Sequence, residues 1–437
     1  MAPTWTKGVI EVKRLVALVG VVLALIFLVT GCGGGNEEAQ GNGKASGDVR
    51  IIMEEVPDTD IVQDMIGQFN EQYPDINIQI EALPYDQMRD KIVSSFMAPE
   101  PTYDLIIVDN PWMYDFAISD FLDPLDERID AAGDNYNYED FAEPVRQIAE
   151  VDGQTYGIPF YNYGLGLIYR QDLFKQAGLN PPTTLDELQS AAQQLQQQGS
   201  AGIAMQPQRG YKIFEEWGNW LFAAGGQIQN QNGQIVLDSP EAREALSKYI
   251  DTYECCAPPN SLNWSFDPAL RSVSSGNSAM MMSYNWMLPT LNDPDGPAGD
   301  LAGKFGLAEV PGGEAVLGAW YWSIPTNSAN KEAAWTFVQW ITSPKQDIER
   351  VSMGGAPVRN SVMENKQVWE QGFGQSYYKT VQAILQDSAP LADGPNAEEM
   401  IQAVGTELNA AVAGQQSVDQ AITRAADRAE EITKSKD

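Results

Sequence analysis

The stretch VRIIMEEV (49–56) decides the fold, because it opens a regular alternation of strand and helix patterns. Its run of β-branched and other apolar residues predicts a strand. Residues 58–69 follow with apolar side chains three and four apart, which predicts a helix with one buried face. In INIQIE (76–81) apolar and polar residues alternate, which predicts a second strand with one polar face.

Two more segments complete a β-α-β-α-β order. Apolar residues at helical spacing between 88 and 96 predict another helix, and the continuous apolar run LIIV (105–108) predicts a strand covered on both faces. This order is the unit of an open α/β sheet, whose crossovers are almost always right-handed. Ligands of such sheets bind outside the carboxyl ends of the strands, which here are the pairs at 54–55 and 109–110. Neither strand is followed by a Gly-x-Gly-x-x-Gly or Walker pattern, so the sequence does not indicate a nucleotide.

The composition of the 437-residue chain excludes several classes of function. Apolar residues make up 43% and charged residues 20%, so the chain can bury a large core, and its length favours two lobes. The sequence has no histidine, which excludes His-based catalytic triads, imidazole zinc sites and histidine general bases. The formal net charge of -33 leaves no basic footprint for nucleic acid.

The first 32 residues have the features of a bacterial lipoprotein signal peptide. Three basic residues precede a 16-residue apolar run at 15–30, which is short for a membrane span of about 20 residues. VTGC (29–32) is similar to a lipobox, in which a peptidase cuts before the cysteine and Cys32 is lipidated. Residues 33–47, rich in small and polar residues, predict a flexible tether. A membrane-spanning anchor is the alternative, whereas the lipoprotein interpretation predicts an extracytoplasmic protein at the cell surface or in the periplasm, anchored by lipid.

Cys255 and Cys256 are adjacent, and they are the only cysteines beyond the signal peptide. Adjacent α-carbons lie about 3.8 Å apart, less than the roughly 4.4–6.8 Å usual for a disulfide, so a vicinal bridge would close a strained ring. An oxidising compartment nevertheless favours pairing. The vicinal disulfide is therefore favoured over two buried free thiols, and neither state indicates catalysis because no nearby base is evident.

Start signals mark several later helices. Thr184 with Glu187, and Ser417 with Gln420, fit the pattern of a capping box. Ser239 stands before a proline, which is the usual order of a helix cap and the first helical residue.

Five longer segments carry a further pattern between residues 101 and 362. They are PTYDLIIVDNPWMYDF (101–116), YGIPFYNYGLGLIYRQDLFKQAGLNPPTTLDEL (156–188), SGNSAMMMSYNWML (275–288), LGAWYWSIPTNSANKEAAWTFVQWITSP (317–344) and GGAPVRNSV (354–362). In this order, and behind a lipobox, they resemble the extracellular solute-binding proteins of bacterial ABC importers, a family that includes maltose- and trehalose-type sugar receptors. The second segment is the most specific, because it matches the family pattern around a hinge crossing.

The resemblance implies an α/β architecture, the two-lobed type II fold of periplasmic binding proteins. Each lobe is expected to be a doubly wound, mainly parallel sheet, and several strands are expected to form the hinge. Lobe 1 is expected at 48–157 plus 309–345, and lobe 2 at 158–308 plus 350–437.

The resemblance also implies a ligand site in the cleft between the lobes. Sugars present hydroxyl edges and flat C–H faces, so a sugar site needs carboxylates or amides together with aromatic rings. Asp109 matches a family position that commonly bonds ligand hydroxyls, and its alternative role is an N-cap of the next helix. Glu54 ends the first strand and is expected to face the cleft, with a solvated loop as the alternative.

The hinge and the later segments add further expected ligand contacts. Asn162 and Tyr163 follow the hinge proline, and Tyr163 departs from the acidic residue that sugar-binding relatives often carry there. Trp286 and Trp320 match family tryptophans and are expected to stack on the ligand. Tyr284 stands where glycine is commoner, which is expected to narrow the pocket.

Three more residues are predicted ligand contacts, two of them with a structural alternative. Trp217 matches an aromatic helix of the relatives and is expected at the cleft. Trp264 lies in a loop from which it could reach the cleft or pack on the surface. Arg359 could bond hydroxyls through its planar set of donors or form a structural salt bridge. Core packing is the prediction for Trp322, Trp335 and Trp340.

The resemblance implies a receptor and not an enzyme. It predicts capture of a sugar or oligosaccharide between the lobes, closure of the hinge, and delivery to the membrane permease. No catalytic residue, metal site or cofactor is predicted, and the expected partners are a small-molecule ligand, permease subunits and the membrane, with the protein a monomer. The alternatives are a receptor for a cationic solute such as a polyamine, a carboxylate-pair glycosidase, for which no spacing identifies an acid and a base, and a purely structural lipoprotein.

Overall fold

The computed structural model describes residues 45–196, 199–230 and 233–434. The predicted signal peptide, the lipidation site Cys32 and the predicted tether as far as residue 44 lie outside the described residues. Within the described ranges, no helix combines the length and the apolar character needed to cross a membrane.

The N-terminal strands form the predicted parallel unit. β1 (Gly47–Glu54), β2 (Ile76–Leu83) and β3 (Leu105–Asp109) are separated by α1 (Pro57–Gln72) and α2 (Tyr85–Phe96). β1 lies between β2 and β3 and is parallel to both. The predicted β-α-β-α-β order is therefore confirmed.

The residues that the sequence pattern predicts to be buried in this unit are buried in the structure. On α1 the predicted apolar face is buried, with Val62 and Phe69 fully covered and Met65 nearly so. Every residue of β3 is buried, as the uninterrupted apolar run predicts for a strand covered on both sides.

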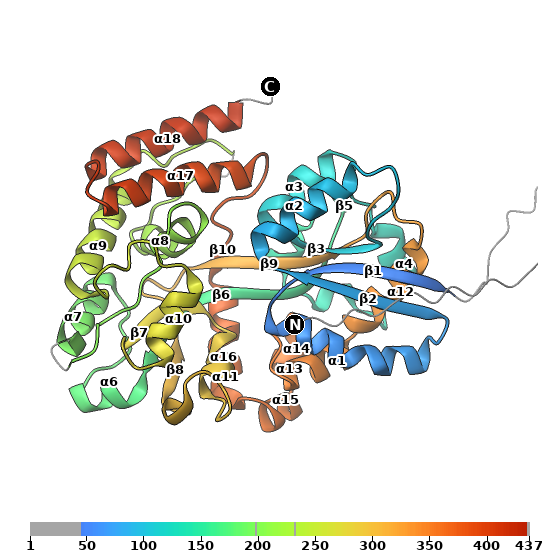
Figure 1. Cartoon of the computed structure of the whole chain (residues 1–437), viewed down its shortest axis with the longest axis horizontal. Coiled ribbons are helices and arrows are strands. Elements are labelled where there is room, and N and C mark those ends of the chain that lie inside the picture. Colours follow the sequence, from blue (N-terminus) through green and yellow to red (C-terminus); the bar gives the residue numbers. More distant parts are fainter. Residues whose placement is uncertain (1–44, 197–198, 231–232, 435–437) are drawn as a thin grey trace, which may run out of the picture. The chain divides into compact units, whose positions relative to one another are not determined.

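Two long strands connect two groups of elements in an eight-stranded sheet (Figure 1). The order of the sheet is β2-β1-β3-β9-β6-β7, with β10 (Ser388–Ala389) paired to β9 and β8 (Phe305–Ala308) paired to β6. β6 (Ile158–Arg170) pairs through its first half with β9 (Ala315–Ser323), and through its second half with β7 (Met280–Tyr284) and β8.

The sheet is mixed, and this corrects one part of the prediction. β1, β2 and β3 are parallel, whereas β9 is antiparallel to β3 and β6, and β7 and β8 are antiparallel to β6. β6 carries the chain out of the group around β1, and β9 brings it back, so the two crossing strands run in opposite directions. A mainly parallel sheet is therefore present only in the N-terminal group.

The first group of elements contains β1 to β3 and the helices that cover them. Its further elements are α3 (Asn110–Ile118), α4 (Asp126–Ala132), the 3-10 helix η1 (Tyr138–Asp140), α5 (Glu143–Ile148), the hairpin β4 (Glu150–Val151) and β5 (Gln154–Thr155), α12 (Lys331–Ile341) and α13 (Pro344–Ser352).

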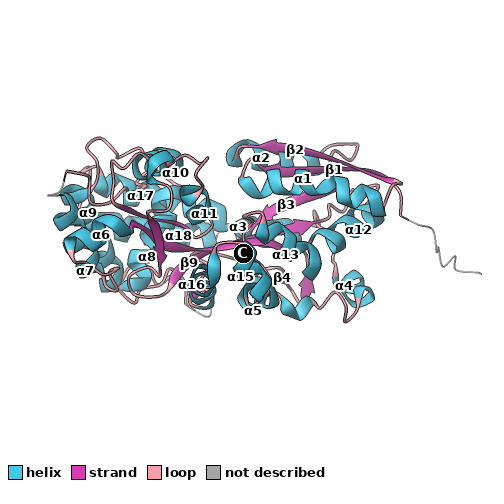
Figure 2. Ribbon diagram, turned by 90° about the horizontal axis from the view of Figure 1, so that it is seen from below, coloured by secondary structure: helices cyan, strands magenta, loops and turns pink. Residues whose placement is uncertain are grey.

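The second group surrounds β7 and β8, and in Figure 2 helices flank the strands on both sides. Its elements are α6 (Gln171–Ala177), α7 (Leu185–Gln196), α8 (Tyr211–Ala223), α9 (Pro240–Cys256), α10 (Phe266–Ser274), α11 (Met287–Asn292), the 3-10 helix η2 (Gly299–Leu301), α17 (Ala397–Val412) and α18 (Val418–Lys434). Between α13 and β10 lie α14 (Asn360–Met363), α15 (Lys366–Gln371) and α16 (Gly374–Gln386), and α16 packs against β6 and β9.

The two predicted capping boxes are realised to different degrees. Ser417 and Gln420 exchange both bonds, each backbone N–H donating to the other side chain at 3.1 and 3.2 Å. The hydroxyl of Thr184 accepts from the N–H of Glu187 at 3.2 Å, but the Glu187 carboxylate accepts from Thr183 instead of closing the box.

Helix α9 has a defined feature at each end. The predicted cap Ser239 accepts a hydrogen bond from the N–H of Ala242 at 3.1 Å. At the other end a disulfide joins Cys255 to Cys256, the state favoured from the sequence. Cys256 is fully buried, and its carbonyl accepts from the N–H of Gly202 at 2.9 Å.

Three tryptophans predicted to pack in the core do so. Trp322 is fully buried in β9, and Trp335 and Trp340 are 8% and 6% exposed on α12. Their ring contacts are with other core aromatics, such as Phe337 beside both Trp322 and Trp340.

Candidate functional site

A cavity of about 370 Å³ lies between the two groups of elements, beside the crossing strands β6 and β9. Its lining is mostly aromatic, with two carboxylates and two cationic side chains among the polar residues. The lining residues are Glu54, Val56, Tyr85, Asp109, Tyr161, Tyr163, Gln208, Arg209, Tyr211, Lys212, Phe266, Tyr284, Trp286, Trp320 and Gln402.

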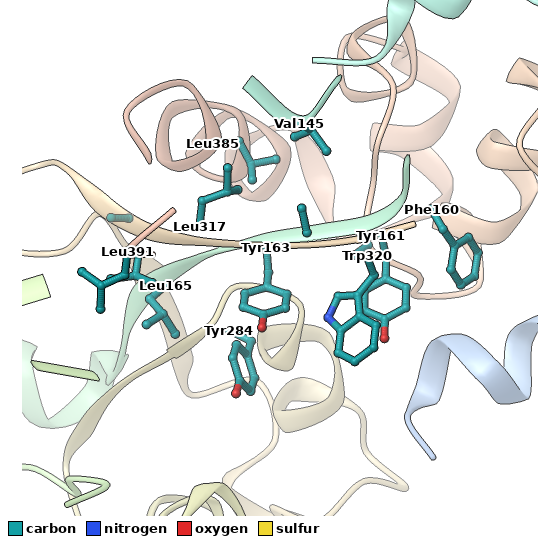
Figure 3. Packing of buried hydrophobic residues seen from close by; sticks show 14 of the residues in the cluster. Val145, Phe160, Tyr161, Tyr163, Leu165, Tyr284, Leu317, Trp320, Leu385 and Leu391 are labelled. Atoms are coloured by element: carbon teal, nitrogen blue, oxygen red, sulfur yellow. The ribbon is translucent and has the colours of Figure 1, made fainter. Parts of the chain in front are cut away.

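The crossing strands supply one aromatic surface of the cavity. Tyr161 of β6 is paired in register with Trp320 of β9, and the two rings stack with centroids 5.4 Å apart. Tyr163 lies two residues further along β6, so its side chain points to the same face of the strand. Figure 3 shows the three rings on one side of the two strands.

The position of Tyr163 depends on a glycine in the neighbouring strand. Tyr163 is paired in register with Gly318 of β9, and its ring lies across this residue. A Cβ atom on Gly318 would lie 2.1 Å from Cζ and 2.4 Å from the hydroxyl oxygen of Tyr163. Only glycine therefore leaves the ring in its present place.

A second aromatic surface comes from the group around β7. Tyr284, the last residue of β7, stacks on Trp286 with an interplanar angle of 5° and centroids 5.5 Å apart. Phe266 lies 5.1 Å from Tyr284, and Tyr163 meets the same ring edge-on at 4.5 Å. The indole N–H of Trp286 is buried and has no hydrogen-bond partner among the described residues.

Tyr85 connects the two groups at the cavity. It begins α2, and its ring lies 5.1 Å from Trp112 of α3 and 5.9 Å from Trp320. It also lies 5.6 Å from the ring of Tyr211, which begins α8 in the second group. The lining is thus continuous from one group to the other.

Asp109 has the capping role that was the alternative considered from the sequence, and its contact with a ligand stays a prediction. Its side chain caps α3 by accepting from the N–H of Asn110 at 3.0 Å, and it also accepts from the hydroxyl of Tyr85 at 2.9 Å. It is fully buried at the edge of the cavity. Burial is the main cause that raises the pKa of Asp109 well above its usual range, against the opposing bond from Tyr85, and the negative charge of Glu54 adds to the rise.

Glu54 lies at the carboxyl end of β1, where the open-sheet rule places ligands. Its carboxylate accepts from the hydroxyl of Tyr161 at 3.4 Å. Burial and the charge of Glu54 together hold the pKa of Tyr161 well above its ordinary value.

Two cationic side chains also line the cavity, and the sequence did not predict either of them. Lys212 of α8 is held by Glu215 at 3.2 Å and also donates to the hydroxyl of Tyr284. Arg209 precedes α8 and donates to the hydroxyl of Thr406 at 3.2 Å. They balance the two lining carboxylates in formal charge.

The structure brings six of the ten predicted ligand-binding residues together at the cavity. These are Glu54, Asp109, Tyr163, Tyr284, Trp286 and Trp320. Their role in binding a ligand stays a prediction. The sequence missed Tyr161, Tyr85 and Tyr211, of which Tyr161 could have been found because it shares a strand face with Tyr163.

The other four predicted contacts do not line this cavity, and each has a physical reason. Asn162 alternates with Tyr161 and Tyr163 along β6, so its fully buried side chain points to the opposite face. Trp217 is fully buried within α8. Trp264 instead lines a separate open hollow with three prolines and Arg271.

Arg359 is a structural residue, which was the alternative considered from the sequence. It is fully buried, and it donates to the carbonyls of Thr342 and Asn137 at 2.8 Å. It also pairs with Asp140 at 3.4 Å and lies over the ring of Phe141. Its bonded donors, Nε and Nη1, are thus taken up within the first group of elements, and Arg359 is absent from the cavity lining.

The fold and the cavity define a class of binding protein. The model of the bacterial extracellular solute-binding protein family matches residues 55–348, and the chain belongs to this family. The resemblance seen in the sequence and the two-lobed type II fold are thereby confirmed.

Individual relatives are distant but cover most of the chain. The chain is 24% identical to a probable amino-acid ABC transporter periplasmic-binding protein of Sinorhizobium fredii, over 80% of each chain. It is 25% identical to the mannitol-binding protein of Pseudomonas aeruginosa, over 87% of this chain and 92% of that protein. The crystal structure of an ABC transporter solute-binding protein from Agrobacterium radiobacter in complex with ribitol aligns with a TM-score of 0.80 at 23% identity, covering 89% of this chain and all of that one.

Proposed function

We propose that this protein is the substrate-binding component of an ABC importer and that it captures a polyol or a short sugar in the aromatic cavity. The observation that carries the proposal is the pairing of two stacked aromatic surfaces, Tyr161 with Trp320 and Tyr284 with Trp286, around a set of polar groups. Rings of this kind cover the C–H faces of a sugar, and the carboxylates of Glu54 and Asp109 can accept from its hydroxyls.

The size of the cavity supports a small ligand. Its volume of about 370 Å³ is at the lower end of the roughly 300–1,000 Å³ typical of small-molecule sites. The ring of Tyr284 occupies a position where a smaller residue would leave more room. A polyol, a monosaccharide or a disaccharide therefore fits the proposal better than a long oligosaccharide.

The charge of the lining separates this proposal from the polyamine alternative. The carboxylate of Glu54 favours a cation, but Lys212 and Arg209 line the same cavity and would repel one. A hydroxyl-rich neutral ligand meets no such conflict, because hydroxyls both donate and accept. Two of the relatives compared above are named for mannitol or hold ribitol, which supports the same class of ligand.

The proposed mechanism needs no covalent chemistry. The ligand binds to residues of both groups, closure about β6 and β9 is favoured by those shared contacts, and the membrane permease receives the closed form. We propose that the protein acts as an extracytoplasmic monomer, tethered through lipidated Cys32, and that it releases its ligand unchanged. The predicted lobe boundaries, 48–157 plus 309–345 and 158–308 plus 350–437, stay a prediction. The pairing of Arg350 with Asp58 and of Arg359 with Asp140 favours a later start for the last segment of lobe 2.

Isothermal titration calorimetry with a fixed panel tests the ligand class. The panel contains D-mannitol, ribitol, maltose, L-glutamate and spermidine, each titrated into the chain from residue 33 onward. Saturable binding of one of the first three, with the ligand recovered unchanged, is expected. Binding of spermidine or L-glutamate alone, or hydrolysis of maltose, would overturn the proposal.

A further inference from the structure

Three residues of the cavity lining converge on one buried carboxylate that does not itself line the cavity. Glu215 lies in the first turns of α8, and its side chain is 6% exposed. It accepts from the hydroxyl of Tyr284 at 3.1 Å, from the ammonium of Lys212 at 3.2 Å and from the hydroxyl of Tyr163 at 3.4 Å. These donors come from β7, α8 and β6, so a single group connects three elements at the cavity.

The packing of α8 holds this carboxylate in place. One turn after Glu215, the side-chain oxygen of Asn219 accepts from the backbone N–H of Val316 in β9 at 3.0 Å. Gly218 lets the helix approach closely, because a Cβ there would lie 2.7 Å from Val316 and 2.6 Å from Leu391. The helix therefore cannot move relative to β9 without losing these contacts.

The chemistry of the cluster decides which way its hydrogen bonds run. A carboxylate accepts only, whereas a phenol has one proton to donate and lone pairs that accept. With Glu215 as the shared acceptor, the protons of Tyr163 and Tyr284 are both directed away from the cavity. The phenolic oxygen of Tyr163 then offers the cavity only its lone pairs, and that of Tyr284, which already accepts from Lys212, offers its remaining lone pair.

We propose that Glu215 is a positioning and specificity residue that turns Tyr163 and Tyr284 into hydrogen-bond acceptors toward the ligand. This inference rests on the proposed function, which it deepens by assigning the polarity of the ligand. The lining carboxylates Glu54 and Asp109 are also acceptors, so the ligand must supply several hydroxyl donors. A polyol or sugar with free hydroxyls meets this requirement, and an analogue with methylated hydroxyls does not.

The neighbouring residue supplies a matched control. Glu216 is equally buried on the same helix, but its carboxylate accepts from the hydroxyl of Tyr249 and the N–H of Gln206, neither of which lines the cavity. Burial raises the pKa of Glu216 to about 8, and the amide of a glutamine can keep the role of acceptor toward Tyr249 and Gln206. Glu216→Gln therefore alters the same helix without altering the cavity, whereas Glu215→Gln introduces an N–H donor against the tyrosines.

The first test needs no ligand. The protein is labelled with ¹³C at the ζ-carbon of tyrosine, whose chemical shift responds to the hydrogen bond of the phenol. Tyr163→Phe and Tyr284→Phe identify the two resonances. We expect Glu215→Gln to move both resonances and Glu216→Gln to move neither. Unmoved resonances in Glu215→Gln would overturn the proposal, whatever the ligand proves to be.

The second test uses the panel member among D-mannitol, ribitol and maltose that binds best. We expect Glu215→Gln to weaken its binding about 10- to 100-fold, the scale of a lost or reversed buried hydrogen bond, and Glu216→Gln to change it less than about twofold. Melting temperatures of the free variants separate this effect from loss of stability. Binding by Glu215→Gln within twofold of the unaltered protein would overturn the inference. If none of the three ligands binds the unaltered protein but Glu215→Gln shifts the tyrosine resonances, only the proposed function is overturned.

Discussion

The close approach of Tyr163 to Gly318 allows a test of how the cavity is built. In Gly318→Ala the new methyl group would lie between 2.1 and 2.4 Å from three atoms of the Tyr163 side chain, whereas such contacts are not observed below 3.0 Å. Gly318 lies within β9, where alanine suits an extended backbone, so the conflict is with the ring alone. Overpacking of this kind costs about 1–3 kcal/mol, and we expect Gly318→Ala to lower the free energy of unfolding by that amount.

The cause can be isolated by removing the ring. Urea unfolding is measured for Gly318→Ala, Tyr163→Ala and the double variant. If the methyl group is harmful only because of the ring, Gly318→Ala costs less than about 0.5 kcal/mol in the Tyr163→Ala background, so the two changes are not additive. Calorimetric titration should show weaker ligand binding in Gly318→Ala as well, because the displaced ring loses its contact with Tyr284. An equal cost of Gly318→Ala in both backgrounds would refute this reasoning.

Three further predictions concern the cavity, a buried acid and a surface helix. Trp286→Ala should weaken binding of the best panel ligand by about 1–3 kcal/mol in calorimetry, the scale of a lost buried aromatic contact. The control Trp335→Ala, in the core, should lower the melting temperature and leave the affinity within about twofold. Burial raises the pKa of Glu216 from 4.5 to about 8, so the folded state holds this proton more tightly than the unfolded state, and the free energy of unfolding should fall as the pH rises through this window. In urea unfolding from pH 5 to 8, Glu216→Gln should show a shallower decline of this free energy than the unaltered protein. Parallel declines in the two proteins would count against the prediction. Gly67→Ala should raise the free energy of unfolding by about 0.5–1 kcal/mol, because Gly67 is exposed within α1 and a Cβ there meets no atom within 4 Å; an unchanged or lower unfolding midpoint would contradict this.

The sequence predicted the elements of the N-terminal group well, because their signals are local. The alternation in 76–81 and the apolar run at 105–108 depend only on which faces of a strand are covered, and β2 and β3 follow them. The direction of β6 and β9 could not be predicted in the same way. It depends on where the chain crosses from one group of elements to the other. The periodicity of apolar residues along a single segment carries no information about that crossing.

The candidate site was predicted in part for a related reason. Asp109 and Glu54 follow from the rule that ligands bind at the carboxyl ends of strands, and both lie at the cavity. Trp217 and Arg359 were misplaced, because an aromatic ring or a guanidinium has similar sequence surroundings whether it faces a cleft or the core. Their burial is set by neighbours from distant segments, such as Asn137 beside Arg359.

The sequence by itself determined the class of the protein, through the order of strand and helix periods and the five matching segments between residues 101 and 362. Only the tertiary structure decided which side chains share the cavity and which way their hydrogen bonds run. Glu215 meets Tyr163 and Tyr284 from 52 and 69 residues away along the chain. Such a meeting is fixed by the register of β6 against β9 and by the packing of α8 on that sheet, and neither has a signal in the residues that lie next to Glu215.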